Sequence, residues 1–63
     1  MTKREWEAVV WRVERALDEV RLAQQLLHGG GPEETAVADR LTLVLSDLIN
    51  ARSEANGAAQ SAA

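Results

Sequence analysis

The chain has 63 residues, which suffice for one small domain with a limited hydrophobic core. It contains no cysteine and a single histidine, so disulfides and thiolate metal sites are excluded, and a histidine metal site would need several converging carboxylates. Seven basic and ten acidic residues give a net charge of -3, which does not attract phosphate backbones over long range. Among the usual means of stabilising so short a domain, oligomerisation remains.

The first predicted element is a helix over residues 3–28. Thr2 and Glu5 have the T-x-x-E spacing of a capping box, and neither proline nor glycine interrupts the chain before residue 29. Apolar residues then recur at alternating spacings of four and three, with Gln24 at the one polar position. This heptad-like series predicts an amphipathic helix, and its apolar members are Trp6, Val10, Val13, Leu17, Val20 and Leu27.

The segment HGGGP, residues 28–32, predicts a loop over residues 29–31 between two helices. Gly29 is placed to end the first helix in a left-handed conformation, and Pro32 suits the first turn of the next helix. The HGGG string also occurs in the oxyanion loops of lipases and esterases, which serve a G-x-S-x-G serine and a separate catalytic histidine. This chain has neither of these, so the string predicts no catalytic residue.

The second predicted helix covers residues 32–56. Its apolar series has the same spacing and consists of Val37, Leu41, Val44, Leu48, Ala51 and Ala55. Ala38, Leu45 and Ile49 widen this stripe. Asn56-Gly57 resembles a helix end, and residues 58–63 have little to bury, so the sequence predicts a disordered tail there.

Together these elements predict an all-α fold, an antiparallel αα-hairpin over residues 1–57. Two antiparallel helices have no interior, because each buries only a narrow seam on the other. A second hairpin that covers the rest of both stripes gives a dimeric four-helix bundle. We therefore expect the dimer and core interface to contain Trp6, Val10, Val13, Leu17, Val20, Leu27, Val37, Leu41, Val44, Leu45, Leu48 and Ile49.

Some residues of the first helix lie off this stripe and are candidates for binding a partner. At about 100° per residue, Trp11 and Leu22 lie opposite the stripe and Leu26 lies at its edge. Tryptophan and arginine are favoured interface anchors, which indicates a partner-binding strip made of Trp11, Arg15, Leu22 and Leu26. The alternative is that Arg15 stacks over an exposed Trp11 and nothing else binds there.

The predicted hairpin and the opening M-T-K-x-E, residues 1–5, resemble the plasmid repressor-of-primer family of dimeric four-helix bundles, which bind RNA loop pairs. That family's heptad frame, carried over without gaps, places charged residues in the core, where they cannot be buried unpaired: Glu5, Arg12, Arg15 and Glu19. Of the family's RNA-binding face, only Lys3 carries over. The resemblance thus concerns architecture and does not imply RNA binding.

The sequence favours a small non-enzymatic protein–protein interaction module, an adaptor, assembly factor or regulator, that binds itself and an unidentified protein. The alternative is a dimeric nucleic-acid-binding regulator that uses the arginines of the first helix, Arg4, Arg12, Arg15 and Arg21. The acidic balance and the interleaved acids disfavour nucleic acid. No cofactor or metal is expected. Neither a signal peptide nor a membrane span is predicted, so the cytoplasm is the expected location.

Overall fold

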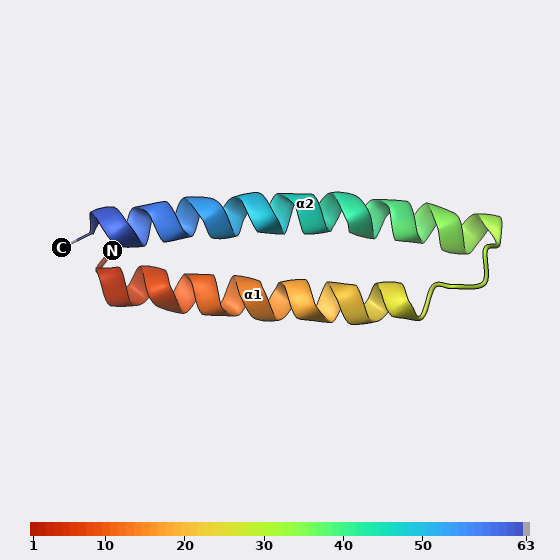
Figure 1. Ribbon diagram of the computed structural model, residues 1–63, viewed down its shortest axis with the longest axis horizontal. Helices are drawn as coiled ribbons and strands as arrows, with labels where there is room; N and C mark the ends of the chain where they lie inside the picture. The colour runs from red at the N-terminus through yellow and green to blue at the C-terminus, as the bar shows by residue number, and fades with distance from the viewer. Residues whose placement is uncertain (63) are drawn as a thin grey trace.

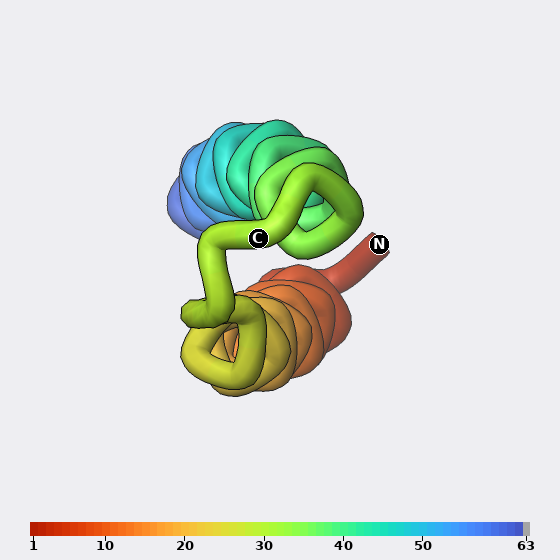
Figure 2. The backbone as a smooth tube through the Cα atoms, turned by 90° about the vertical axis from the view of Figure 1, so that its right-hand side faces the viewer, coloured from red at the N-terminus to blue at the C-terminus, as the bar shows by residue number. Residues whose placement is uncertain are grey.

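A computed structural model describes residues 1–62 and shows two helices, α1 (Lys3–Gln25) and α2 (Pro32–Ser61). They run antiparallel along their whole length, so that the end of α2 lies beside the start of α1 (Figure 1). The Cα atoms extend over 49 × 14 × 12 Å. Figure 2 looks onto the loop end of the hairpin, where the connecting loop crosses from one helix to the other. The predicted all-α hairpin is confirmed.

The start of α1 is the predicted capping box. The backbone N–H of Glu5 donates to the Thr2 hydroxyl at 3.2 Å, and the backbone N–H of Thr2 donates to the Glu5 carboxylate at 2.9 Å. These bonds satisfy donors that have no partner within the first turn of a helix. Local sequence alone therefore determines where α1 begins.

The end of α1 comes earlier than residue 28, where the sequence placed it. The helix ends at Gln25, and the next two backbone N–H groups, of Leu26 and Leu27, donate to carbonyls three residues back. Such bonds tighten a last turn and stop the α-helical pattern. The residue with positive φ is Gly30, at 76°, and not Gly29. Gly29 instead lies against the Glu34 carboxylate, which a Cβ at this position would meet.

The start of α2 agrees with the sequence, but its end does not. Gly31 is the N-cap and Pro32 the first helical residue, and the carbonyl of Gly31 accepts a bond from Thr35 N–H at 2.9 Å. The helix does not stop at residue 56 but continues to Ser61, so residues 58–61 of the predicted disordered tail are helical. Alanine is the best helix former, and Ala59 is buried. Ala63 lies outside the described residues.

The seam between the helices uses a different set of α2 residues from the one the sequence favoured. The seam residues of α2 recur at spacings of four and three, and they are Glu34, Ala38, Leu41, Leu45, Leu48, Arg52, Ala55 and Ala59. The corresponding residues before the loop are Trp6, Val10, Val13, Leu17, Val20 and Gln24 of α1, and Leu27, which follows its end. The residues beside these lines that are also half-buried are Val9, Ala16, Ala23 and Ala58. Leu17, at 1% exposure, is the one large side chain of residues 1–62 that is fully buried. The core is therefore a single line of contacts.

Candidate interaction surfaces

The described residues 1–62 form no pocket. Within the same residues, no three side chains among His, Asp and Glu lie close enough together to hold a metal ion. Neither α1 nor α2 is long and apolar enough to cross a membrane. The distinctive feature of this surface is the amount of exposed apolar side chain that it carries.

Exposed apolar side chains occur on both helices. The buried residues are Leu17, Ala55 and Ala59, two of which are alanines. By contrast, eight large apolar side chains are exposed: Met1, Trp11, Leu22, Leu26, Val37, Leu43, Val44 and Ile49. Single exposed apolar residues are normal in soluble proteins, whereas aligned groups of them mark interaction sites. The grouping of these residues along the helices is therefore informative.

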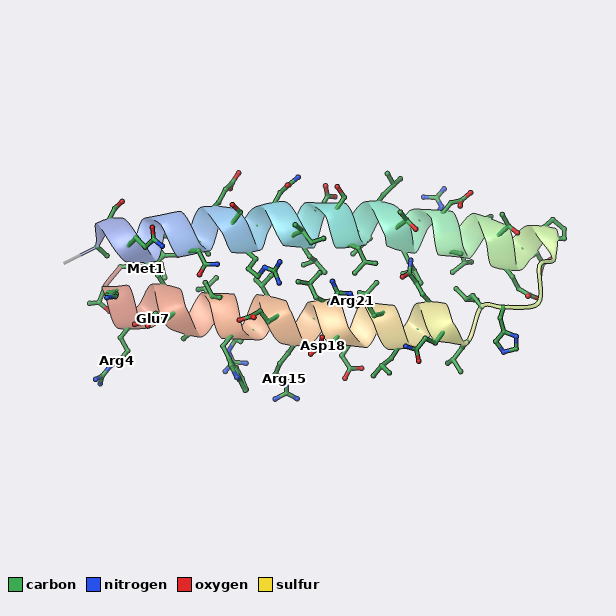
Figure 3. All side chains as sticks on the ribbon, viewed as in Figure 1. Met1, Arg4, Glu7, Arg15, Asp18 and Arg21 are labelled. Atoms are coloured by element: carbon green, nitrogen blue, oxygen red, sulfur yellow. The ribbon has the colours of Figure 1, made fainter. Side chains whose placement is uncertain are left out.

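One group is the Trp11 strip, made of Trp11, Arg15, Leu22 and Leu26. Trp11 and Leu22 are each 55% exposed and Leu26 is 80% exposed. The guanidinium carbon of Arg15 lies 5.0 Å from the centroid of the Trp11 ring, within cation–π range. Figure 3 shows Arg15 pointing away from α2. The Arg15–Trp11 stack of the alternative interpretation thus forms, and more than half of Trp11 remains exposed.

The charged groups of α1 are mostly solvated. Arg21 lies 3.9 Å from Asp18, one turn away, and both side chains are exposed. The i,i+3 spacing brings the two side chains together, and an exposed ion pair contributes little to stability. Arg15 stacks on Trp11, and both Arg15 and Arg4 project away from α2 (Figure 3). Of the arginines proposed for nucleic-acid binding, Arg4, Arg12 and Arg15 thus lie within roughly 80° of one another on the outer side of α1 at about 100° per residue, whereas Arg21 lies apart and pairs with Asp18.

A polar contact joins the helices near the loop end of the hairpin. The side-chain amide of Gln24 donates to the hydroxyl of Thr42 at 3.2 Å, and this hydroxyl donates to the carbonyl of Ala38 at 3.1 Å. Gln24 is the polar position that the sequence placed within the α1 series. Its bond to Thr42 ties one register of α1 against α2, as buried polar positions do in coiled coils.

The residues predicted for the dimer and core interface divide into two sets. Those of α1, together with Leu41, Leu45 and Leu48 of α2, lie in the seam within one hairpin. Val37, Val44 and Ile49 are exposed at its edges. Glu34, Arg52 and Ala59 were not predicted as seam residues. The signal was present in the spacing of Ala38, Leu45, Arg52 and Ala59, but a charged residue within that series concealed it.

Comparison of the chain with protein-family models, curated proteins and solved structures finds no match.

Proposed function

We propose that the protein is a small non-enzymatic protein–protein interaction module that self-associates through its amphipathic helices. The observation that carries this proposal is the contrast between one fully buried large side chain, Leu17, and eight exposed ones. A dimer of hairpins, arranged as a four-helix bundle, removes part of this apolar surface from water. As an adaptor, assembly factor or regulator, the dimer acts by contact and performs no chemistry of its own.

The small size of the chain supports self-association. A single core in a chain below about 70–80 residues rarely supplies more than ~3–5 kcal/mol, and short domains commonly add a disulfide, a metal or a partner subunit. The chain has no cysteine. The hairpin alone has one line of buried contacts, whereas a four-helix bundle has an interior that all four helices share. In such a bundle, the second copy supplies the other half of that interior.

The Trp11 strip is the proposed docking site for a different protein, and the cytoplasm is the proposed location. Trp11 and Arg15 belong to the residue types that dominate binding energy at interfaces. The strip follows one side of α1, which suits packing against another helix or insertion into an apolar groove. The stack of Arg15 on Trp11 holds both side chains in place before binding, which lowers the entropy lost when a partner docks.

Sedimentation equilibrium tests the self-association. At micromolar concentration we expect twice the chain mass of 6.9 kDa, and a thermal midpoint that rises with protein concentration because assembly stabilises the fold. A folded 6.9 kDa monomer with a concentration-independent midpoint would overturn the proposal.

A further inference from the structure

The two broad faces of the hairpin differ in composition, beginning with α1. Residues seven apart lie almost on one line along a helix, so each helix surface divides into columns. On one side of the α1 seam, the column consists of Val9, Ala16 and Ala23. On the other side it consists of Glu7, Glu14 and Arg21. One flank of α1 is therefore small and apolar, and the other is charged.

The same asymmetry occurs on α2. One column beside its seam consists of Val37, Val44, Ala51 and Ala58. The column on the other side consists of Thr35, Thr42, Ile49 and Asn56. Valine and alanine again occupy one flank completely, and three of the four residues of the opposite flank are polar.

The antiparallel arrangement brings the two apolar columns onto one broad face. Seen from the N-terminal end of α1, successive residues of α1 turn clockwise about the helix axis. Successive residues of α2 turn anticlockwise, because α2 runs back toward the viewer. On each helix, at about 100° per residue, the valine–alanine column lies roughly 40–120° from the seam, on the side against the direction in which successive residues turn. Both columns therefore lie on the same side of the hairpin, which we call the Val/Ala face. Figure 3 looks onto the opposite, polar face, where Glu7 and Arg21 are labelled.

We infer that the Val/Ala face is the surface on which a second copy of this chain docks, an assignment that rests on the proposed self-association. A two-fold axis places identical surfaces against each other, so the interface must be self-complementary. The columns of the Val/Ala face carry no charge, and the charged columns at its margins contain both signs: Glu5, Arg12 and Glu19 on α1 and Glu33, Arg40, Asp47 and Glu54 on α2. The polar face, by contrast, would bring the acids Glu7 and Glu14 of both copies into one interface.

The size of the Val/Ala face also fits a second copy. With Cα extents of 49 × 14 Å, one broad side of the hairpin, with its seam and charged margins included, has a footprint of roughly 700 Å², near the ~800 Å² that each partner buries in a standard interface. Valine and alanine are short, and the separation of packed helices depends on the side chains at their contact. The two hairpins can therefore approach closely along their full length.

This assignment leaves Trp11 on the outside of the dimer. At about 100° per residue, Trp11 lies roughly 160° around α1 from Val9, whereas Leu26 lies roughly 60° from Ala23, at the margin of the face. Docking through the Val/Ala face thus does not cover Trp11, and each dimer presents this side chain twice. A partner with two matching sites would then bind with added avidity.

Val44 and Ile49 provide a matched pair of variants. Both are β-branched residues of α2, they are 42% and 41% exposed, and they lie on opposite faces. By sedimentation equilibrium, we expect Val44→Asp to weaken the dimer at least about 10-fold, because it buries a carboxylate in an apolar interface. Ile49→Asp should leave the dimer intact. A dimeric Val44→Asp, or dissociation by Ile49→Asp alone, overturns the assignment of the face.

Thiol labelling supplies a second readout that does not depend on a disruptive substitution. The chain has no native cysteine, so Ala51→Cys on the Val/Ala face and Ser53→Cys on the polar side each introduce one exposed thiol. As the protein concentration rises through the range in which the dimer forms, we expect the rate of maleimide labelling to fall at least about 10-fold at position 51 and to stay constant at position 53. Equal rates in a dimeric protein refute this face alone, whereas a folded wild-type monomer refutes the self-association as well.

Discussion

The amide of Gln24 and the hydroxyl of Thr42 are hydrogen-bonded across the hairpin at 3.2 Å. Gln24 follows Val10 and Leu17 in the same column of α1, so an amide occupies a position where an apolar side chain would otherwise continue the seam. The bond lies at an exposed site, where a hydrogen bond contributes only ~0.5–1.5 kcal/mol net. Gln24 therefore contributes more to the alignment of the helices than to their stability.

Replacing Gln24 with leucine should raise the free energy of unfolding by about 1 kcal/mol, because a half-buried leucine gains more than the exposed bond loses. Urea denaturation at one fixed protein concentration measures the change, and Thr42→Val is the control that removes the acceptor together with the bond from its hydroxyl to the Ala38 carbonyl. A less stable Gln24→Leu protein would show that the hydrogen bond, and not apolar burial, dominates at this position.

Truncation of Leu17 should be the most damaging single change in the seam. Leu17 is 1% exposed, and Leu17→Ala should lower the free energy of unfolding by ~2–5 kcal/mol through lost burial and the cavity it leaves. Leu43→Ala, at a 68% exposed position of α2, should change it by less than about 0.5 kcal/mol. Chemical denaturation of the two variants side by side makes the comparison, and equal losses would contradict the seam described here.

Trp11→Ala should leave the hairpin folded. Its side chain contacts solvent and Arg15, so its removal should cost only the ~0.5–1 kcal/mol of an exposed cation–π contact. Circular dichroism and the thermal midpoint report the fold, while capture of a binding partner by Trp11→Ala, compared with Leu43→Ala, reports the strip. Unfolding of Trp11→Ala would mean that the indole is part of a core, and unchanged capture would remove the strip as a docking site.

Acid should weaken the start of α1 through Glu5. The backbone N–H of Thr2, and secondly its side chain, hydrogen-bond to the carboxylate and lower the pKa of Glu5. Since the folded-state pKa lies below the unfolded one, this stabilisation is complete above the unfolded pKa and is lost as pH falls through the folded pKa. Far-UV circular dichroism between about pH 7 and pH 2 should show a smaller acid loss of helix for Glu5→Gln, which keeps a capping side chain without a charge. Superimposable titration curves would rule out this contribution.

Two glycine substitutions should have opposite effects. Gly57 lies within α2 with nothing within 4 Å of an added Cβ, so Gly57→Ala should stabilise the protein by ~0.5–1 kcal/mol. Gly30 has a φ of 76°, which strains any L side chain, and Gly30→Ala should destabilise by about 1 kcal/mol. Thermal denaturation at equal concentration measures both changes. Destabilisation by Gly57→Ala would favour a helix end at residue 57 over the continuous α2 described here.

Local sequence determined the features that depend on neighbouring residues. The capping box of Thr2 and Glu5, the proline at the first position of α2 and the glycine loop between the helices were all predicted, and the structure contains them. Each of these features acts through bonds or backbone preferences within a few residues. The same locality made the antiparallel hairpin predictable, because a short loop leaves two long helices little choice but to lie side by side.

Tertiary structure decided which columns of α2 face α1 and where α2 ends. Spacings of four and three fit the series through Val37 and Val44 as well as the series through Leu45, Arg52 and Ala59. Apolarity favoured the first series, but an arginine can pack its stem in a seam and keep its charge in water. Likewise, the alanine-rich end of α2 has no capping signal, and its helix extends beside the start of α1 where Ala59 is buried. Both outcomes depend on contacts between residues that are distant in sequence. The periodic pattern within one helix gives no information about the energies of those contacts.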